Sequence, residues 1–340
     1  MISATGRQQQ KLWKKASLIR DRHVGGKVYF RGLIEFSNVC ENDCYYCGIR
    51  SSLEGLKRYT MTVDEIMECA AFCLKAGYGS LVLQSGQQRG EKFVSYVGEV
   101  IRGIKKKFPE LGITLCAGEQ DEYAYRKFFK AGAHRYLLRI ETSDRNHYRK
   151  LHPGAMLFEN RVKSLEILRE IGYQVGTGVM ICSPGQSIDN LADDIMFMKK
   201  MDIDMAGMGP YVPNKGSRFE NESYSAKNAF SKSLNMIAAL RLVMPDINIA
   251  SVTALQALDP EGREKGLQAG ANVIMPVLTP GKYRSSYLLY DNKPCVDETK
   301  EDCFVCIKKR VENAGMNIGE GEWGDSPHFF KRREKEEKCL

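Results

Sequence analysis

Short apolar segments alternate with longer amphipathic segments along most of the chain, and this alternation constrains the fold more than any other feature. Eight short segments have the apolar character of buried strands: 33–37, 80–84, 113–116, 136–140, 174–181, 205–208, 248–251 and 273–275. Between them, apolar residues recur at helical spacing in 62–76, 91–107, 122–131, 158–171, 188–201, 226–244 and 261–269. We therefore predict strands and helices in regular succession.

Strands that are joined by single helices pair in parallel through right-handed crossovers. Eight such strands predict an α/β fold that closes as a (β/α)8 barrel, with an open doubly wound sheet as the alternative. Gly77, Gly132, Gly172 and Gly270 each follow an amphipathic segment and precede a strand, as glycines that end helices do. Four such positions support the predicted alternation.

The two ends of the chain depart from this pattern. Residues 11–23 predict an amphipathic lead-in helix, which the pair Gly25-Gly26 ends. After Pro280 the alternation gives way to glycine, proline, tyrosine and charged residues. We predict an N-terminal helix and extension at 1–32, the barrel at 33–280 and a C-terminal cap at 281–340.

The composition excludes several classes of function. The 340-residue chain has a formal net charge of +8, but much of the excess lies near its ends, and the basic run 331–338 also contains three glutamates. Such a mixture predicts a solvated surface, and no nucleic-acid-binding motif is present. No secretory signal opens the sequence and no apolar stretch approaches the roughly 20 residues that span a bilayer. Eleven cysteines favour free thiols and metal ligands over disulfides, so we expect a cytoplasmic protein that binds neither nucleic acid nor membrane.

Cys40, Cys44 and Cys47 form a C-x3-C-x2-C motif directly after the first predicted strand. In a barrel, the loops after the strands build the active face. Three thiolates in one loop can bind three corners of an iron–sulfur cube and leave the fourth iron open to another ligand. A zinc site is the alternative, but it needs four ligands and no histidine lies in the loop. A small electron-transfer ferredoxin is a further alternative, which the long predicted barrel disfavours.

With Tyr46 as the aromatic residue before the last cysteine, this motif resembles that of the radical S-adenosylmethionine (SAM) superfamily. The resemblance implies a [4Fe-4S] cluster whose open iron is chelated by the amino and carboxylate groups of SAM. It also implies reductive cleavage of SAM to methionine and a 5′-deoxyadenosyl radical.

Further phrases resemble one branch of this superfamily, the HydE family of [FeFe]-hydrogenase maturases, which is related to biotin synthase and methylornithine synthase. They include Arg-Gly-Leu-Ile-Glu-Phe-Ser-Asn-Val-Cys at 31–40, Leu-Gln-Ser-Gly at 83–86, Arg-Ile-Glu-Thr-Ser-Asp at 139–144 and Phe-Glu-Asn-Arg at 158–161. The resemblance implies that Ser85, Gly86, Glu141 and Arg161 bind SAM. It also implies that Thr114 and Arg139, near strand ends, face an anionic substrate.

Two phrases depart from the family pattern. Gln87-Gln88 stands where an acidic pair usually follows Leu-Gln-Ser-Gly, and Cys182-Ser183 stands where glycine and leucine usually precede Pro-Gly-Gln. Both departures fall on the predicted active face. They leave the predicted radical machinery intact and put the identity of the substrate in question.

A second group, Cys295, Cys303 and Cys306, forms C-x7-C-x2-C in the C-terminal segment. The family has an auxiliary iron–sulfur site at this spacing that varies between members, which implies a [2Fe-2S] or [4Fe-4S] cluster here. Zinc or free thiols are the alternatives, and Cys339 is the nearby candidate for a fourth ligand. Cys69 and Cys73, one helical turn apart, are predicted to be buried thiols of a helix face.

The resemblance as a whole implies an enzyme of hydrogenase diiron-subcluster maturation. Its substrate would be a small anionic or organometallic compound, its reductant a ferredoxin or flavodoxin, and its partners the other hydrogenase maturases. A radical SAM mutase or synthase that acts on an amino acid, like methylornithine synthase, is the alternative. A non-catalytic iron–sulfur carrier is a third class, which would have no use for Glu141, Arg161 or a barrel interior.

Overall fold

Eight parallel strands form a ring in the computed structural model, which describes residues 1–338. In order around the ring these are β1 (Lys27–Ser37), β2 (Ser80–Ser85), β3 (Gly112–Cys116), β4 (Arg135–Leu137), β5 (Gln174–Thr177), β7 (Met205–Ala206), β9 (Asn248–Ile249) and β10 (Val273–Ile274). β10 pairs with β1, and a parallel bridge between Ala250 and Val273 joins the last two strands. The predicted (β/α)8 barrel is therefore confirmed, and the open sheet is excluded.

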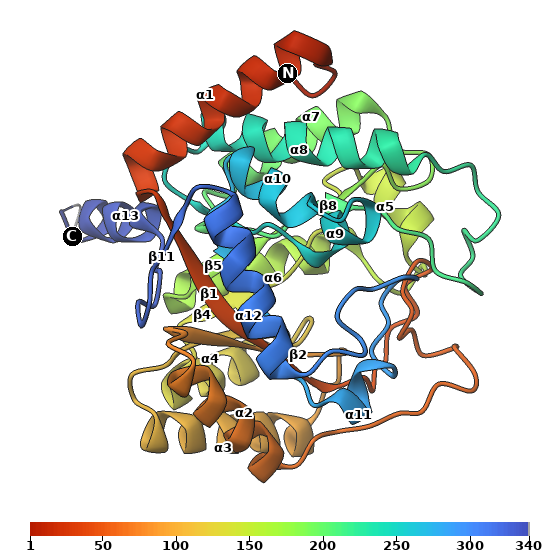
Figure 1. Ribbon diagram of the computed structural model, residues 1–340. Coiled ribbons are helices and arrows are strands. Elements are labelled where there is room, and N and C mark those ends of the chain that lie inside the picture. Colours follow the sequence, from red (N-terminus) through yellow and green to blue (C-terminus); the bar gives the residue numbers. More distant parts are fainter. Residues whose placement is uncertain (339–340) are drawn as a thin grey trace.

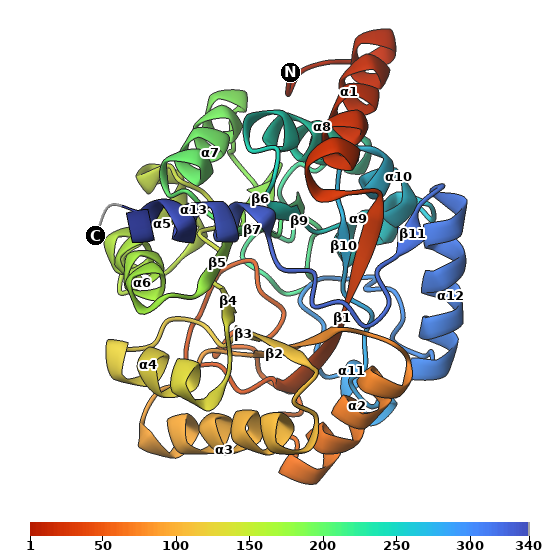
Figure 2. The same cartoon turned by 90° about the vertical axis from the view of Figure 1, so that its left-hand side faces the viewer.

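Helices surround this ring, as Figure 2 shows in a view along the barrel. The crossovers contain α2 (Val63–Lys75), α3 (Glu91–Lys107), α4 (Glu122–Ala131), α5 (Arg145–Leu151), α6 (Phe158–Ile171), α7 (Ile188–Lys200), α8 (Ala226–Val243), α9 (Thr253–Leu258) and α10 (Gly262–Gln268). One large apolar cluster fills the space between strands and helices. The seven predicted helices all exist, whereas α5 and α9 were not predicted.

Local sequence sets the ends of these helices. Thr62 begins α2 and Ser187 begins α7 with reciprocal side-chain and backbone hydrogen bonds, which typically stabilise a helix by about 1 kcal/mol. Gly132 and Gly172 end α4 and α6 with φ angles of 117° and 105°, a left-handed conformation that glycine adopts without strain.

The strands are short, and two of them are interrupted near the carboxyl end of the barrel. The predicted strand 174–181 is divided into β5 and β6 (Met180–Ile181), and β6 pairs with β8 (Gly209–Pro210) in a separate two-stranded sheet. A Cβ atom on Gly178 would collide with the backbone of Gly207. The backbone segments that follow β5 and β7 therefore approach closely where the strands break. This small sheet forms part of the rim around the carboxyl end of the ring.

The C-terminal segment covers both ends of the barrel. After α11 (Gly281–Arg284), residues 287–293 lie over the carboxyl ends of the strands, where the backbone of Leu289 accepts a hydrogen bond from Gly48. α12 (Lys300–Asn313) then runs along the outside, β11 (Asn317–Ile318) pairs with β1, and α13 (Pro327–Lys338) ends the described chain (Figure 1). Residues between β11 and α13 cross the amino ends of the strands (Figure 2). The sequence predicted a cap but not its helices or its second contact with the barrel.

At the other end of the chain, α1 (Gly6–Val24) lies against α8, in agreement with the predicted lead-in helix but longer by five residues at its start. β1 begins at Lys27, ahead of the boundary at residue 32 that the sequence suggested. Within residues 1–338, the structure has no helix with the length and apolar character that crossing a membrane requires.

Candidate functional site

A cavity of about 320 Å³ opens at the carboxyl end of the barrel, where the loops after the strands meet. Cys40, Cys44 and Cys47 all line it, in the loop that follows β1. Asn38, which is fully buried, fixes the start of this loop: its amide nitrogen donates to the carbonyls of Lys57 and Ser286 at 2.9 and 2.7 Å. The predicted position of the motif on the active face is therefore observed.

The three thiols suit a polynuclear iron–sulfur cluster better than a single metal ion. Burial raises the pKa of Cys44, and burial likewise raises the pKa of Cys47 to about 12, so thiolates at these positions require a strong positive charge beside them. Their sulfur atoms do not gather within 4.8 Å as a set, whereas the ligands of one zinc ion lie about 4 Å apart. The donor set thus fits a [4Fe-4S] cluster bound by three cysteines.

The end of β2 approaches this loop closely. A Cβ atom on Gly86 would collide with the carbonyl oxygen of Val39 and with the side chain of Cys40, so only glycine fits there. The Gly86 amide donates to the carbonyl of Ser37 at 3.0 Å, and the Ser85 hydroxyl donates to the carbonyl of Gly86 at 2.8 Å. Both residues line the cavity beside the cysteines.

Arg139 and Glu141 meet on the cavity wall just after β4. The Arg139 guanidinium donates to Glu141 Oε2 from Nη2 at 2.8 Å and from Nε at 3.1 Å. Glu141 is buried, and its φ of 66° is a left-handed conformation that non-glycine residues adopt mainly at functional or strained positions. Both side chains line the cavity, where their hydrogen bonds join them.

Arg161 reaches the same wall from α6. Its guanidinium forms a buried ion pair with Glu119 and also donates to the carbonyl of Arg139. Glu119 lies just after β3, where strand ends carry functional side chains, but the sequence analysis did not single it out. Because the pair orients Arg161 beside the cavity, Glu119 is part of the candidate site.

Tyr46 also lines the cavity and packs edge-on against His152, with ring centroids 5.6 Å apart. His152 in turn stacks on Tyr148 at 4.0 Å, and its Nδ1 contacts the Tyr148 carbonyl at 2.9 Å. Burial, aided by the charge of Arg161, lowers the pKa of His152 to about 3, so this imidazole is neutral at physiological pH. It therefore positions Tyr46 and does not serve as a charged group.

Thr114 is not brought to this cavity. It lies deeper in the barrel, where its hydroxyl accepts a hydrogen bond from Arg135 Nε at 2.9 Å. Thr114 lines a smaller space of about 20 Å³, enough for about one water molecule, which shares the walls Leu137, Gly207 and Met275 with the main cavity. The middle of β3 therefore places Thr114 one layer below Arg139.

The departures from the family pattern have structural contacts. The carbonyl of Gln87 accepts from the amide of Glu41 in the cysteine loop, and its side-chain oxygen accepts from the amide of Glu119, both at 2.8 Å. Gln88 donates to Ser37 at 3.2 Å. Gln87 thus ties the cysteine loop to the loop that holds Glu119.

Cys182 and Ser183 make no comparable link. Cys182 has a left-handed φ of 60°, and the Ser183 hydroxyl lies 2.7 Å from Nε2 of His147 on α5. Neither residue lines the main cavity, so this departure does not alter the observed cavity wall.

The cavity roof contributes residues that the sequence did not identify. Tyr287, Tyr290 and Lys293 come from the C-terminal segment, and Lys293 Nζ forms a buried ion pair at 2.6 Å with Glu35 on β1. Residues 285–299, from which these side chains come, form neither helix nor strand, so no periodic pattern could reveal such contacts.

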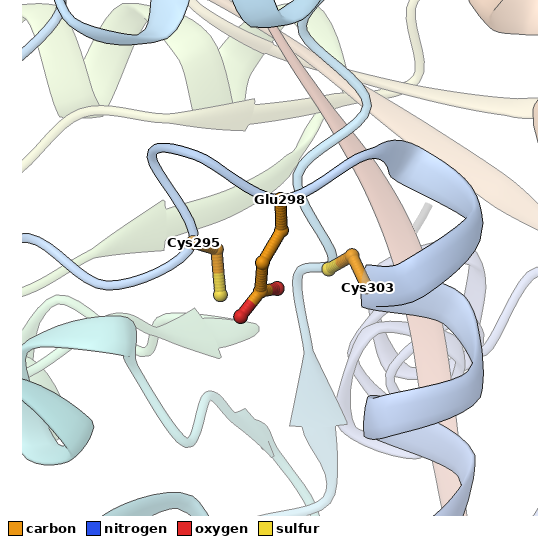
Figure 3. A group of neighbouring side chains, drawn as sticks. All are labelled: Cys295, Glu298 and Cys303. Atoms are coloured by element: carbon orange, nitrogen blue, oxygen red, sulfur yellow. The ribbon is translucent and has the colours of Figure 1, made fainter.

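The second cysteine group lies outside this cavity, and Figure 3 shows two of its members, Cys295 and Cys303. Cys295 precedes α12, and Cys303 and Cys306 lie on it; Cys303 is buried and the other two are half-buried. Cys339 falls outside the described residues. Cys69 and Cys73 are buried, as predicted, and donate to the carbonyls of Leu278 and Ser80.

Known proteins agree with this arrangement. The family model for the radical SAM superfamily matches residues 34–198. The [FeFe] hydrogenase maturase subunit HydE of Thermotoga maritima is 43% identical over 322 residues, which cover 94% of this chain and 90% of that protein. The 3-methylornithine synthase of Methanosarcina acetivorans is 28% identical, over 90% of this chain and 85% of that protein. The crystal structure of methylornithine synthase (PylB) superposes with a TM-score of 0.78 at 24% identity, covering 94% of this chain and 92% of that one, and supports the fold.

The barrel, the cysteine loop and these similarities define an enzyme that generates a radical from SAM. The chain belongs to the radical SAM superfamily and, within it, to the family of HydE. When bound, a [4Fe-4S] cluster and SAM supply the radical chemistry of this superfamily. Cys40, Cys44 and Cys47 would hold the cluster.

Proposed function

We propose that this enzyme acts in the maturation of [FeFe]-hydrogenase, in assembly of the diiron subcluster of the H-cluster. The similarity to HydE carries this proposal, because it extends over 94% of the chain at 43% identity and so includes most of the C-terminal segment that roofs the cavity. The methylornithine synthase reaches 28% identity over a similar length. The higher identity over a similar share of the chain favours the HydE function over the synthase function.

The proposed roles of the polar residues follow from where they lie. Ser85 and Gly86 would contact the methionine end of SAM, since they border the cysteine loop. Glu141 would accept hydrogen bonds from an ammonium or ribose hydroxyl group, and Arg161, oriented by Glu119, would bind a carboxylate. Tyr46 would close the cavity beside them, held by His152.

The substrate in this proposal is a small anionic or organometallic compound. Arg139 is a cation on the cavity wall whose side chain is 33% exposed, and its single described partner, Glu141, leaves guanidinium N–H groups free for a second anion. Most of the other lining is apolar, from residues such as Leu33, Val212 and Met275, and would exclude water from a reactive intermediate. Thr114 would contact the substrate only if the substrate extends from the main cavity into the smaller space that Thr114 lines.

The proposal also includes partners and a compartment. A ferredoxin or flavodoxin would reduce the cluster, and the other hydrogenase maturases would supply and receive the substrate. An oxygen-sensitive cluster and unpaired cysteines suit the reducing cytoplasm.

A maturation assay tests this function. The purified enzyme, with its cluster reconstituted anaerobically, replaces HydE in a mixture that contains the other maturases, SAM, a reductant and hydrogenase lacking its diiron subcluster. We expect hydrogen evolution to appear with the wild-type protein and to remain absent with the Cys44→Ala variant. If hydrogenase stays inactive while the same preparation converts a free amino acid to methylornithine, the proposal is wrong and the synthase function is correct.

A further inference from the structure

A basic surface lies beside the cysteine loop and is formed by residues 145–157. This stretch comprises α5 and the loop to α6, and it contains three cations but no acidic residue. Two of the cations, Arg149 and Lys150, are exposed in the last turn of α5, and neither forms an ion pair within residues 1–338. Leu157, at the end of the stretch, is 51% exposed. The surface therefore combines positive charge with an exposed apolar side chain.

This surface touches a proposed cluster ligand. The Met156 Sδ atom lies 3.9 Å from Cys44 Sγ, and the Leu151 carbonyl accepts a hydrogen bond from the amide of Tyr45 at 3.0 Å. Met156 is half-buried and its neighbour Leu157 is exposed, so the stretch leads from solvent to Cys44 within two residues. Because the rate of electron transfer falls steeply with distance, an electron that arrives at this surface has a favourable path to the cluster.

A third cation reaches the same place from another segment. Arg218 is exposed in the loop after β8, and its guanidinium lies over the ring of Tyr45, 4.5 Å from the ring centroid. The Arg218 amide also donates to the Tyr45 carbonyl at 3.1 Å, and Tyr45 directly follows Cys44. None of Arg149, Lys150 and Arg218 lines the barrel cavity, so these three cations are not placed to bind SAM or the substrate.

The acidic residues close to this surface in the sequence are engaged by other groups. Asp144 caps the start of α5, and Glu159 pairs with the remaining cation, Arg145, at 2.6 Å. In the cysteine loop, Glu41 and Asp43 accept hydrogen bonds from backbone amides at 3.0 and 3.1 Å. The three exposed cations therefore remain available to an acidic partner.

Cations beside an exposed apolar side chain suit a transient complex. Opposite charges steer a partner to the surface and raise the association rate, whereas a small contact area keeps the complex weak. An electron carrier needs both properties, since it must bind, pass on an electron and leave. A nucleic acid would match the charge, but the contact with Cys44 would serve no purpose for it.

We propose that Arg149, Lys150 and Arg218, together with Leu157, dock the acidic one-electron carrier protein that reduces the cluster. The inference rests on the proposed function for the carrier and adds the place where it binds. One electron leaves the reduced carrier and enters the oxidised cluster, so the carrier is oxidised and the cluster reduced by one electron each, and no atom is transferred.

Direct binding tests the surface without reference to catalysis. Cluster-loaded protein is titrated anaerobically with an acidic bacterial ferredoxin, by calorimetry at low ionic strength. Arg149→Glu/Lys150→Glu should weaken binding at least about tenfold, because two attractive contacts become repulsive. Arg7→Glu/Lys11→Glu makes the same change of charge on the exposed side of α1 and should bind as the wild type does. Equal affinities of the two variants would overturn the proposal, as would a wild-type protein that binds neither ferredoxin nor, in a parallel titration, flavodoxin.

Reduction of the cluster separates docking from chemistry. Its rate is measured by rapid mixing with limiting reduced ferredoxin, or with dithionite, a small reductant that needs no docking surface. We expect Arg149→Glu/Lys150→Glu to be reduced at least about tenfold more slowly by ferredoxin and at the wild-type rate by dithionite, with normal dithionite-driven SAM cleavage. Wild-type rates with ferredoxin, or equal losses with both reductants, contradict the proposal. Neither measurement uses hydrogenase, so a failure of the maturation function would leave these outcomes unchanged.

Zero-length cross-linking locates the contact on the cluster-loaded enzyme. A carbodiimide joins lysine amines to carboxylates of the bound ferredoxin, and mass spectrometry identifies the joined peptides. We expect a cross-link at Lys150, with a lower yield in Arg218→Gln, which removes a charge of the surface and keeps the lysine. Cross-links confined to lysines of other surfaces, such as Lys106 on α3, would show that the carrier docks elsewhere.

Discussion

The two ends of the barrel hold arginines that differ in their surroundings although they lie four residues apart in the chain. Arg135, on β4, is fully buried at the amino end and pairs with Asp325, 190 residues away, at 2.5 Å. Arg139, just past β4, is one-third exposed to the cavity and pairs with its near neighbour Glu141. The first arginine joins distant parts of the chain, whereas the second is held by local contacts and keeps donors free.

The same contrast extends around both ends. At the amino end, residues 325–332 contribute ion pairs to barrel residues, including Arg332 to Asp204 at 2.9 Å and Lys331 to Asp246 at 2.9 Å. At the carboxyl end, charged residues line an open cavity together with three thiols. We infer that substitutions at the amino end change stability, and that substitutions at the carboxyl end change chemistry.

The largest effect is expected at the cysteine loop. Cys44→Ala removes one of three proposed cluster ligands, so SAM cleavage to 5′-deoxyadenosine should fall below detection, while the free energy of unfolding of the metal-free protein changes little. Iron content and 5′-deoxyadenosine, measured anaerobically with dithionite, test this. Cys69→Ala is the matched control, because that thiol is buried on α2, outside the cysteine loop and the cavity, and its loss should leave iron content and cleavage intact. If the Cys44→Ala variant cleaves SAM as fast as the wild type does, the cysteine loop at the carboxyl end does not carry the chemistry, and the inferred difference between the two ends is wrong.

The next effect should appear in stability at the amino end. Arg135→Met leaves Asp325 without its main charged partner, and loss of one member of a buried ion pair typically costs about 3–5 kcal/mol. Burial alone would raise the pKa of Asp325, but His134 and Arg135 hold it below its ordinary value. Urea unfolding of the metal-free protein measures the loss, and its absence would show that the amino end is not held by this pair.

The third effect concerns the arginine of the carboxyl end. Arg139→Met retains the apolar stem, so we expect SAM affinity to change by less than about tenfold and substrate-dependent turnover to fall about 100-fold, as for loss of a charge-assisted contact of about 3 kcal/mol. Glu141→Gln should instead weaken SAM binding. Equilibrium binding of SAM and product formation are measured separately for both variants. Because the two side chains share a hydrogen bond, the double variant Arg139→Met/Glu141→Gln measures the coupling free energy between them. Normal turnover by the Arg139→Met variant would show that Arg139 does not bind the substrate.

Periodicity was enough to predict most of the fold. Helix spacing and the terminal glycines placed α3, α4 and α6 at their observed bounds. The short helices α5 and α9 lack enough turns to show a period, and α13 carries too few apolar residues for one. α12 does place Cys303, Ile307 and Val311 at helical spacing, but the sequence analysis did not recognise this short period within the charged C-terminal segment. The path of residues 317–332 beneath the barrel depends on pairs such as Arg135 with Asp325, which no local pattern reveals.

The residues of the site that could be predicted lie in one short motif or directly after a predicted strand. The three cysteines share the loop after β1, Gly86 follows β2, and Glu141 follows β4. Glu119 and Lys293 became visible only when the fold brought them to Arg161 and Glu35. In the second cysteine group, the sulfur atom of Cys306 accepts a hydrogen bond from Arg310, a contact that the spacing of the three cysteines does not reveal. Sequence spacing predicts which residues are near, but side-chain direction decides which of them meet.

The smallest effect is a pH dependence of stability that belongs to the amino end. Burial opposes a charge on His328, but hydrogen bonds to Asp202 and Asp246, at 2.8 and 2.9 Å, outweigh it and raise the pKa of His328 to about 9. An unfolded histidine has a pKa of about 6.5, so the folded state binds the extra proton between these values. The stabilisation is therefore complete below about pH 6.5 and is lost as the pH rises through about 9. Since the side chain is partly exposed, we expect about 1–2 kcal/mol.

His328→Gln removes this contribution and keeps a hydrogen-bonding side chain. The free energy of unfolding of the wild-type protein should exceed that of the variant by the full amount near pH 6, and the two should converge above about pH 9. SAM cleavage by the cluster-loaded variant should follow the wild-type pH profile, because His328 lies at the opposite end of the barrel from the cysteine loop. A difference in stability that grows with pH would have the wrong sign for a protonated His328, and an altered cleavage profile would show that the two ends are coupled.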